Sequence, residues 1–572
     1  MCGIVGLFGE KIDRSSLIQG IGSLRHRGPD GEGMFINPSE KVGLAHRRLS
    51  IIDLSENASQ PMTDSSGRFT IVFNGEVYNY RELRGQLSDY PFRTNSDTEV
   101  VLAAFEKWGI ASLEKFIGMF AFLIWDEREQ KLFAVRDRFG VKPLYRCTLP
   151  DGTMAFASEI KALFAMGMPR EKNIETWATY LAYGAYDHGR ETFWKGIESV
   201  QPGTALSFSK HEVSKNLWYD LVEKVGDDID TRAEQEVADE YLSLLKSSVD
   251  LRFRSDVPVG INISGGLDSS ILYSIVRDRR ENPGSVECFT FITGDPAYDE
   301  LPWVEKLLEG GGASLNVIRL HAKEIPELAE SVQSFQDEPF GGFPTLAYAK
   351  IFEAASQSGI KVLLDGQGID EQWAGYDYYL NIQESDDAPL VQGTKSDRQV
   401  GSMLSADMSA KAIRPSFPKP FKESLRNLQY RDACFTKIPR ALRFNDRISM
   451  RTSTELREPF LDHRLFELAL RQPRERKVAD GITKVLPRKL ATKMIPANVS
   501  QTPKRPVQTP QREWLRGELS HWADAKIDYA VNSNSDWFDA GVVSEKWNHF
   551  KVGDGDNSFP FWQIINLGLI TS

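Results

Sequence analysis

A turn rich in glycine and serine, placed between an apolar strand and a helix, constrains the fold of this chain more than any other feature. The run Ser-Gly-Gly-Leu-Asp-Ser-Ser at residues 264–270 follows the apolar stretch Val259–Ile263 and leads into a helical pattern at Ser269–Val276. Further short apolar strands, at Val286–Ile292 and Lys361–Leu364, are separated by helical segments. Strands that alternate with helices indicate a parallel sheet, so we expect an α/β domain with helices on its sheet.

The preceding part of the chain has a different pattern of apolar residues, which predicts mostly strands. Short apolar runs bounded by Gly, Asn or Asp, such as Ile4–Phe8 and Ala121–Trp125, predict strands, and a helical pattern interrupts them at Ser96–Lys107. A charged, Asp-rich segment then separates this β-rich part from the α/β part. The chain has 572 residues, more than one hydrophobic core usually serves. We therefore expect one domain at residues 2–210, a linker at 211–231 and a second domain at 232–572.

Composition and charge narrow the function classes. The formal net charge of −11 at pH 7 argues against a general nucleic-acid binder, which normally carries a basic surplus. The four cysteines and eight histidines lack metal-ligand spacing, so the sequence predicts neither a disulfide framework nor a zinc site, and a reducing cytoplasm fits best. The longest apolar runs, such as Met119–Trp125, are too short to cross a membrane, so we expect no membrane partner.

Cys2 is a candidate nucleophile because of its place in the chain. It directly follows the initiator Met, and a small residue at position 2 favours removal of that Met. The cysteine would then carry a free α-amino group, and a neighbouring amine can act as the base for a thiol nucleophile. For a lone cysteine near a terminus, the simpler interpretation is an apolar residue in an N-terminal strand.

Several polar motifs accompany Cys2, and each allows two interpretations. Asn74-Gly75 is often a hairpin turn, yet an Asn amide with a Gly backbone N–H also makes a workable oxyanion hole. Asp97, in an Asn-Ser-Asp-Thr-Glu motif, is either a helix cap or a partner for the ammonium group of an amino-acid substrate. An Arg-His-Arg-Gly-Pro-Asp motif at 25–30 and cations at 46–48, beside a predicted strand, complete the set.

Taken in order, these motifs resemble those of the class II, or N-terminal-nucleophile, glutamine amidotransferases. Each motif alone is weak, but four in register are specific. The resemblance implies an α+β sandwich of antiparallel sheets in which Cys2 attacks the glutamine amide while Asn74 and Gly75 stabilise the oxyanion. It also implies a glutamine-binding set, comprising Arg48, Leu49, Ser50, Ile51 and Ile52 for the carboxylate, Asn74 and Gly75, and Glu76 and Asp97 for the amino group.

The run at 264–270 predicts a phosphate site. Backbone N–H groups in such a turn, with the N-terminus of the following helix, bind phosphate, and Ser264, Ser269 and Ser270 add hydroxyl donors. Asp268 would repel a bare phosphate, so it makes most sense as a Mg²⁺ ligand. The run has neither the Lys of a Walker loop nor the Gly-x-Gly-x-x-Gly pattern of a dinucleotide fold.

This heptapeptide is similar to the pyrophosphate loop of the N-type ATP pyrophosphatases, which cleave ATP to AMP and pyrophosphate while adenylating a substrate. A second acidic element, at residues 364–371, contains Asp370 as the expected second Mg²⁺ ligand. By resemblance, Lys484 faces the phosphates or the developing charge and takes part in catalysis. The ATP-binding residues that the resemblance implies are Ile263, Ser264, Gly265, Gly266, Asp268, Ser269, Ser270, Phe291, Asp365 and Gly366.

The order of the two parts is that of the glutamine-hydrolysing asparagine synthetase family, and motifs along most of the chain support the resemblance. It implies that glutamine yields glutamate and ammonia, that ATP with Mg²⁺ converts a carboxylate to an acyl-adenylate, and that ammonia displaces AMP. Glutamine, ATP and a carboxylate acceptor, with aspartate first, are the expected partners, and a homodimer is compatible with the sequence.

One residue departs from the family pattern. The family usually has Ser-Gly-Glu-Gly where this chain has Asp365-Gly366-Gln367-Gly368. The family's glutamate is thought to assist the synthetase step, and Gln367 cannot accept a proton at neutral pH. An acceptor other than aspartate, such as a sugar acid, is therefore an alternative. A β-lactam synthetase fits less well because those relatives tend to lose the nucleophile. A decayed regulatory protein is the alternative of another class, against which the intact motifs argue.

Overall fold

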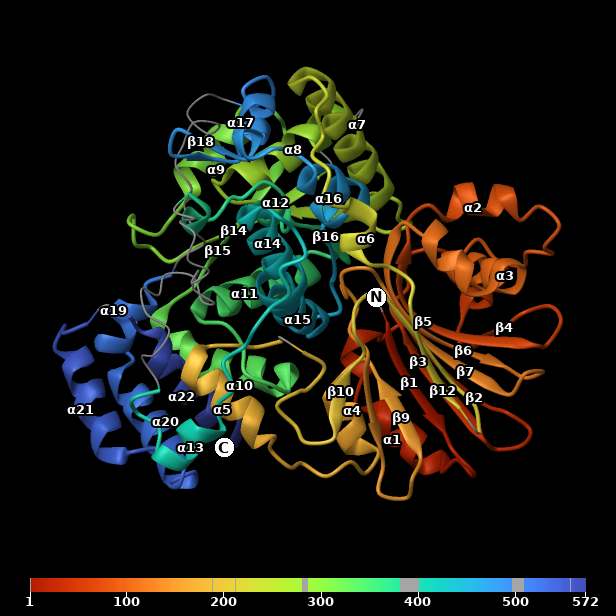
Figure 1. The fold of residues 1–572 in the computed structure, drawn as a ribbon, viewed down its shortest axis with the longest axis horizontal. Helices are drawn as coiled ribbons and strands as arrows, with labels where there is room; N and C mark the ends of the chain where they lie inside the picture. Colours follow the sequence, from red (N-terminus) through yellow and green to blue (C-terminus); the bar gives the residue numbers. More distant parts are fainter. Residues whose placement is uncertain are drawn as a thin grey trace.

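The computed structural model describes residues 2–187, 189–210, 212–279, 286–380, 401–495, 509–555 and 557–571. Two halves lie side by side in Figure 1, with the strands of the N-terminal half in red to yellow and the helix-rich C-terminal half in green to blue. This arrangement confirms the fold class expected from the sequence, since antiparallel sheets precede a parallel sheet flanked by helices.

The N-terminal half contains two antiparallel sheets of six strands each. Its strands are β1 (Gly3–Phe8), β2 (Gly31–Ile36), β3 (Val42–Arg48), β4 (Met62–Thr63), β5 (Phe69–Val77), β6 (Gly118–Asp126), β7 (Lys131–Arg136), β8 (Tyr145–Thr148), β9 (Met154–Ala157), β10 (Ile197–Ser199), β11 (Thr204–Phe208) and β12 (Val213–Leu217). The strand orders are β10-β8-β9-β1-β3-β2 and β12-β11-β7-β6-β5-β4. The sheets pack face to face, and their strands β1 and β3 contact β5.

Helices cover the outer faces of these sheets, so the half has four layers. They are α1 (Arg14–Gly22), α2 (Tyr80–Gln86), α3 (Asp97–Trp108) and α4 (Ile160–Ala165), whereas α5 (Ile174–Tyr183) packs against α13 (Ala406–Lys411) and α22 (Phe559–Thr571) of the C-terminal half. Helix α1 contacts β1 and β3, whereas α3 contacts β5 on the other side. Strand β5 is buried along its whole length because both of its faces are covered. That explains why its first five residues, Phe69–Phe73, are mostly apolar and do not follow an alternating pattern.

The C-terminal half is built on a parallel sheet with strand order β15-β14-β13-β16-β17. Its strands are β13 (Val259–Asn262), β14 (Glu287–Ile292), β15 (Ser314–Arg319), β16 (Val362–Leu364) and β17 (Glu455–Arg457), and a small hairpin consists of β18 (Val478–Ala479) and β19 (Ile482–Thr483). Its helices are α7 (Glu234–Arg252), α8 (Leu267–Arg279), α9 (Leu301–Leu308), α10 (Ile325–Gln336), α11 (Phe343–Gln357), α12 (Ile369–Gln372), α13 (Ala406–Lys411), α14 (Ser424–Arg431), α15 (Lys437–Met450), α16 (His463–Leu470), α17 (Val485–Ala491), α19 (Gln511–Arg516), α20 (Ser520–Ser533), α21 (Ala540–Lys551) and α22 (Phe559–Thr571).

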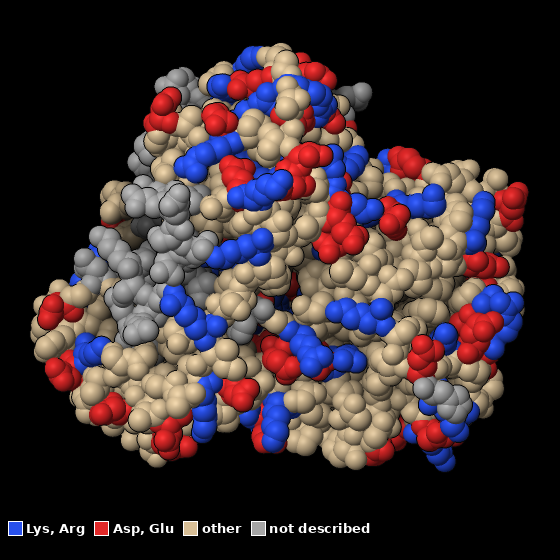
Figure 2. Space-filling model, viewed as in Figure 1, with Lys and Arg blue, Asp and Glu red and all other residues tan. Residues whose placement is uncertain are grey.

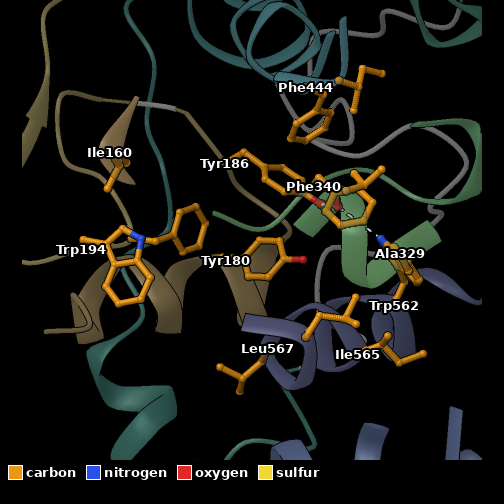
Figure 3. Packing of buried hydrophobic residues seen from close by; sticks show 14 of the residues in the cluster. Ile160, Tyr180, Tyr186, Trp194, Ala329, Phe340, Phe444, Trp562, Ile565 and Leu567 are labelled. Atoms are coloured by element: carbon orange, nitrogen blue, oxygen red, sulfur yellow. Dashed lines mark hydrogen bonds between the residues drawn. The ribbon is translucent and has the colours of Figure 1, made fainter. Parts of the chain in front are cut away.

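Apolar packing joins the two halves. One hydrophobic cluster runs from β1 and α5 to α10, α11 and α22. In Figure 3, Tyr180 of α5 and Tyr186 point toward Phe340 and toward α22. The Trp562 indole donates a hydrogen bond of 3.1 Å to the Phe340 carbonyl, and the Tyr186 hydroxyl donates one of 3.3 Å to the same oxygen. The halves therefore share a core, which fixes the positions of their sites relative to each other.

Two segments differ in detail from what the sequence suggested. Within the segment predicted as a linker, β12 extends the second sheet and α6 (Leu221–Val225) packs against α16. The polar composition of residues 384–411 predicts a mobile loop or insertion. Residues 384–400 lie outside the described part of the chain, and the end of the stretch forms α13. In the described part of the chain, no helix is both long and apolar enough to cross a membrane.

Charged side chains of both signs are spread over the surface. Figure 2 shows Lys and Arg interleaved with Asp and Glu on this face, and it shows the surface hollowed where the two halves meet. A cavity of about 50 Å³ lies at this junction, between the loop that follows β7 and α15, and is lined by Arg136, Asp187, Arg443 and Asp446 among others.

Candidate active sites

Cys2 stands at the start of the central strand of the first sheet. It is 7% exposed, and its backbone N–H donates a hydrogen bond of 3.0 Å to Oδ1 of Asn74. Its carbonyl accepts a hydrogen bond of 3.0 Å from Nε of Arg27, and its Sγ lies 4.0 Å from the Leu49 carbonyl oxygen. Burial raises the pKa of the Cys2 thiol. A neutral thiol needs a base to take its proton when it attacks, and the nitrogen of the same residue is the group held in place beside it.

Asn74 and Gly75 lie within β5, so the turn interpretation of this pair is wrong. Pairing with β6 continues through both residues, from Phe69 to Val77. The buried amide nitrogen Nδ2 of Asn74 has no hydrogen-bond partner among the described residues. Gly75 has φ of +148°, and a Cβ at this position would lie 2.1 Å from the Met119 carbonyl oxygen. Only glycine fits here, and the unused Asn74 donor is available to an oxyanion.

Two buried carboxyl groups lie next to this pair. Oδ2 of Asp97 accepts a hydrogen bond of 2.9 Å from the Val77 backbone, and Asp97 is the first residue of α3, whose N-cap is Ser96. Burial raises the pKa of Asp97 to about 6. Burial also raises the pKa of Glu76 well above its usual value, and the negative charges of Asp97 and Glu455 add to this shift. Oε2 of Glu76 has no partner in the described part of the chain. Two such carboxyl groups favour a bound cation, such as an α-ammonium group.

Arg48 lies at the end of β3, and the segment after it is not a strand, contrary to expectation. The Arg48 guanidinium donates to the carbonyl oxygens of Ser55, at 2.7 Å, and Asp53. Residues Leu49–Ile52 have no regular secondary structure. Ser50 N donates to the Asp30 carboxylate at 2.8 Å, and Asp256 of the other half contacts this segment through its backbone N–H to the Ile51 carbonyl at 2.9 Å. Arg48 thus holds the loop closed on the Cys2 side of β3.

The second group of predicted residues lies at the carboxyl end of β13. Helix α8 begins at Leu267, and Ser270 Oγ donates to the Gly266 carbonyl at 2.7 Å. Ser264 N donates to Ser269 Oγ at 3.1 Å, which closes the loop on itself. Gly265 N donates to a carboxylate oxygen of Glu300 at 3.1 Å, so an anionic group already occupies one of the loop donors. Such a loop at a helix N-terminus can bind phosphate.

Lys484 lies between the two predicted metal ligands. Its ammonium contacts both Asp268 carboxylate oxygens, at 2.6 and 2.8 Å, and Oδ1 of Asp370 at 2.7 Å. Lys484 is buried; it is the N-cap residue of α17 and has a φ of +54°. Gly375 backs this pair, because a Cβ there would lie 1.8 Å from Asp370 Oδ1 and 2.2 Å from Lys484 Cε. The three charged groups, far apart in the chain, form one cluster.

The remaining predicted residues flank the same end of the sheet. Asp365 follows β16, and its Oδ1 accepts a hydrogen bond of 2.7 Å from Gly366 N; burial and then the Asp268 charge raise the pKa of Asp365 to about 6. A Cβ on Gly366 would lie 3.1 Å from Ser269 N, so the two loops touch. Ile263 is buried beside them, and Phe291, at the end of β14, is partly exposed.

The comparisons with known proteins match this two-part geometry. A family model described as "Glutamine amidotransferase domain" matches residues 1–219, and one described as "Asparagine synthase" matches residues 240–571. The chain belongs to the asparagine synthase family. Its N-terminal half is accordingly a glutamine amidotransferase domain and its C-terminal half an asparagine synthase domain, which implies use of ATP.

Individual relatives of this asparagine synthase family member are similar over much of its length. The protein "Asparagine synthetase [glutamine-hydrolyzing] 1" of Bacillus subtilis is 31% identical, with 99% of this chain and 95% of that protein covered. "Amidase chry2" of Gibberella zeae is 30% identical, with 74% and 65% covered. A solved glutamine phosphoribosylpyrophosphate amidotransferase from B. subtilis is 15% identical, with 57% of this chain and 92% of that chain covered and a TM-score of 0.31.

Sequence reasoning missed the residues of the synthase domain that reach the candidate site around Cys2. Arg457 of β17 is fully buried; it pairs with Glu455 at 2.5 Å and approaches Glu76 at 3.6 Å. Its guanidinium also donates to the carbonyl oxygens of Arg252 and Arg254, at 2.7 and 2.8 Å. The only sequence signal was the motif Arg-Glu-Pro-Phe-Leu-Asp-His-Arg at 457–464, which supported the family resemblance without a role.

The donor set fits a Mg²⁺ ion that arrives with ATP. Asp268 and Asp370 converge on one ammonium group, so their oxygens can also share one cation. Among the described residues, no three His, Cys, Asp or Glu side chains could hold an ion together. Mg²⁺ is commonly bound by one or two carboxylates plus substrate phosphates, and it neutralises charge on those phosphates.

Proposed function

We propose that this protein is a glutamine-dependent ligase that transfers ammonia from glutamine to an ATP-activated carboxylate, with aspartate as the first candidate acceptor. The observation that carries the proposal is the contact between Cys2 and Asn74. The nucleophile's own nitrogen donates to Asn74 Oδ1 at 3.0 Å, and Asn74 Nδ2 is buried without a partner among the described residues. A nucleophile, its base and an oxyanion donor are thereby held together.

The glutamine half-reaction uses residues of the amidotransferase domain. Once Met1 is removed, the α-amino group of Cys2 takes the thiol proton and the sulfur attacks the glutamine amide. Asn74 Nδ2 and the Gly75 backbone stabilise the oxyanion. Glu76 and Asp97 bind the substrate ammonium, and the Arg48 loop binds its carboxylate. The amine then protonates the departing ammonia, and water hydrolyses the thioester to glutamate.

The ATP half-reaction uses the loops at the carboxyl end of the parallel sheet. The loop at 264–270 binds the β- and γ-phosphates of ATP, as its backbone donors and position at the start of α8 suggest. Asp268 and Asp370 hold Mg²⁺, which supplies charge neutralisation on the phosphates when bound. Lys484 stabilises negative charge as the acceptor carboxylate attacks the α-phosphate and pyrophosphate leaves. Ile263, Phe291, Asp365 and Gly366 line the nucleotide site.

A non-aspartate acceptor is the second candidate, and Gln367 favours it. Gln367 stands in the loop between Gly366, beside the phosphate loop, and Gly368, beside Leu461. It is therefore at the edge of the nucleotide site, where an acceptor must meet the α-phosphate. An amide offers both a hydrogen-bond donor and an acceptor, which suits a polyhydroxy acid such as a sugar acid.

Pyrophosphate release distinguishes these candidates. The protein would be incubated with ATP, Mg²⁺, glutamine and each of a panel of carboxylates, and pyrophosphate, glutamate and the amide product would be quantified. Aspartate-dependent pyrophosphate with asparagine supports the first candidate. Release with a sugar acid alone supports the second. Glutamine hydrolysis without pyrophosphate from any carboxylate would contradict both, and no reaction at all would favour a decayed binding protein.

A further inference from the structure

Glu458 lies directly beside the loop that carries Gln367. It follows the last residue of β17, and β17 pairs in parallel with β16, with Arg457 opposite Leu364. Asp365 N donates a hydrogen bond of 3.0 Å to the Arg457 carbonyl, so the loop after β16 and the turn after β17 start side by side. A Cβ on Gly368 would lie 2.6 Å from Leu461, which places the rest of the Gln367 loop against the same turn.

The strand that leads to Glu458 connects the two sites. At its start, Glu455 lies near enough to Cys2 to raise the pKa of the thiol, and Arg457 approaches Glu76 of the amidotransferase site. At its end, Glu458 feels the charge of Asp365, in the ATP site. Three residues of extended chain span only about 10 Å. Ammonia that leaves Cys2 for the ATP site therefore has β17 along its course.

The carboxyl group of Glu458 is buried without a direct partner in the described part of the chain. Glu458 is 4% exposed, and within the described ranges no hydrogen bond or ion pair reaches its carboxyl oxygens. Two other deeply buried carboxylates are directly paired with cations: Glu159 with Arg27 and Lys161, and Asp462 with Arg464. A buried acid without a partner costs stability, and a carboxyl with a perturbed pKa beside a candidate site is itself a candidate functional group.

The surroundings of Glu458 hold its carboxyl ready to exchange a proton. Burial raises its pKa to about 8, the charges of Asp365 and Asp446 act in the same direction, and those of Lys142 and Arg252 oppose them. Lys142 comes from the amidotransferase domain and is 1% exposed, so the group faces the domain junction. A general base works best when its pKa is near the operating pH, and this carboxyl meets that condition.

We propose that Glu458 accepts the proton from the attacking nitrogen during amide formation, a role that Gln367 cannot fill. The inference rests on the proposed function, since it needs an acyl-adenylate and ammonia. Ammonia's lone pair forms the new C–N bond, and the carbonyl electrons move to oxygen. One N–H proton passes to the Glu458 carboxylate; the carbonyl re-forms, and the C–O bond to AMP breaks with its electron pair on AMP. Glu458 then releases the proton to solvent.

Glu458→Gln tests this role because it keeps the volume and removes the base. With the carboxylate that supports pyrophosphate release in the unaltered protein, we expect amide formed per pyrophosphate to fall about 10²-fold or more. Acceptor-dependent ATP–pyrophosphate exchange and glutamine hydrolysis should stay within about threefold. The matched control is Glu338→Gln, because Glu338 is also buried with a raised pKa of about 7, but its Oε1 is used by the Phe193 backbone N–H. If Glu458→Gln does not fold, Glu458→Asp replaces it in the test. Asp keeps the charge on a shorter side chain, and we expect it also to lower the amide formed per pyrophosphate.

Rescue separates a proton acceptor from a structural residue. Adding Gln367→Glu to Glu458→Gln returns a carboxylate to the neighbouring loop, and we expect it to restore at least a tenth of the lost amide formation. Unchanged amide formation in Glu458→Gln overturns the inference, as does an equal loss in Glu338→Gln or the loss of pyrophosphate exchange in a folded variant. An unaltered protein that releases no pyrophosphate with any carboxylate overturns the proposed function and this inference together.

Discussion

Arg27 of the amidotransferase domain and Asp446 of the synthase domain, 419 positions apart in the chain, form a two-point ion pair with N–O distances of 2.8 and 3.2 Å. The same guanidinium donates to the Cys2 carbonyl at 3.0 Å and contacts Glu159 at 2.7 Å. Arg27 is fully buried. The backbone of Cys2, the proposed nucleophile, is therefore anchored to helix α15 of the other domain through one side chain.

Replacing Arg27 by Met should destabilise the fold and disturb the nucleophile. Removing one partner of a buried ion pair leaves an uncompensated charge and typically costs about 3–5 kcal/mol. We expect a lower Tm and slower glutamine hydrolysis. Arg128→Met is the control, since Arg128 is 67% exposed and, among the described residues, forms an ion pair only with the neighbouring Glu129; surface pairs contribute about 1 kcal/mol or less. Equal losses in thermal unfolding for both variants would show that the Arg27 anchor is not specific.

Asn74→Ala tests the oxyanion donor. Loss of one such donor commonly reduces kcat by about 10²–10³-fold, so glutamine hydrolysis should fall by this factor. Amide formation from added ammonium chloride should remain, because it bypasses Cys2. Asn216→Ala, on the exposed edge strand β12 of the same domain, is the control and should leave both activities unchanged. A parallel loss of the ammonia-dependent activity would indicate a folding defect instead of a lost donor.

Glutamine hydrolysis should depend on the ionisation of Asp97. Burial raises the pKa of this carboxyl to about 6, so the anionic form that binds a substrate ammonium is present only above that pH. We therefore expect kcat/KM for glutamine to fall as the pH drops through about 6. Asp97→Asn should abolish this fall of kcat/KM at low pH together with most of the activity. Asp13→Asn should leave this fall in place, because the pKa of the exposed Asp13 is lowered to about 2 by Ser15 and Ser16. A profile flat between pH 7 and 5 would exclude the role.

Local pattern was enough to predict many of the helices and strands. The apolar run at Val259–Ile263 and the glycine turn after it gave β13 and the start of α8 because these signals lie within a dozen residues. The turn interpretation of Asn74-Gly75 was wrong because tertiary packing overrides the local preference. The sequence shows an Asn-Gly pair, whereas burial of β5 on both faces keeps the strand straight through it.

Contacts between distant segments could not be predicted in the same way. Nothing in a single sequence specifies that Arg27 pairs with Asp446 and not with another of the chain's many carboxylates. Likewise, β17 becomes the strand that joins both sites only through its pairing with β16, about ninety residues earlier. Glu458 stands in a motif of the sequence, but its candidacy as a proton acceptor follows from its burial, from the lack of a described partner for its carboxyl and from the charges around it.

Lys484→Met should remove ATP chemistry and spare the glutaminase. The Lys484 ammonium lies between Asp268 and Asp370, so its replacement removes the cation that contacts both carboxylates. We expect pyrophosphate release to fall at least 10²-fold while glutamine hydrolysis persists. Lys489→Met is the control on the same helix, since Lys489 is 58% exposed and pairs with Glu234. Chelation of Mg²⁺ should have the same selective effect, and full pyrophosphate release in excess chelator would contradict the two-carboxylate metal site.

Gly375→Ala should be as damaging as the loss of Lys484, although it adds one methyl group and removes no charge. The new Cβ would lie 1.8 Å from Asp370 Oδ1 and 2.2 Å from Lys484 Cε, so at least one of these side chains must move. A displacement of about 1 Å at reacting groups can cost about 10²-fold in rate. Gly541→Ala, in helix α21, is the matched control, because its nearest neighbour would be 3.4 Å away and alanine favours a helix. We expect Gly375→Ala to lose pyrophosphate release, to keep glutamine hydrolysis, and to require more Mg²⁺ for what remains. If both variants matched the unaltered protein, the contact among Asp370, Lys484 and the Gly375 backbone would not be needed for adenylation.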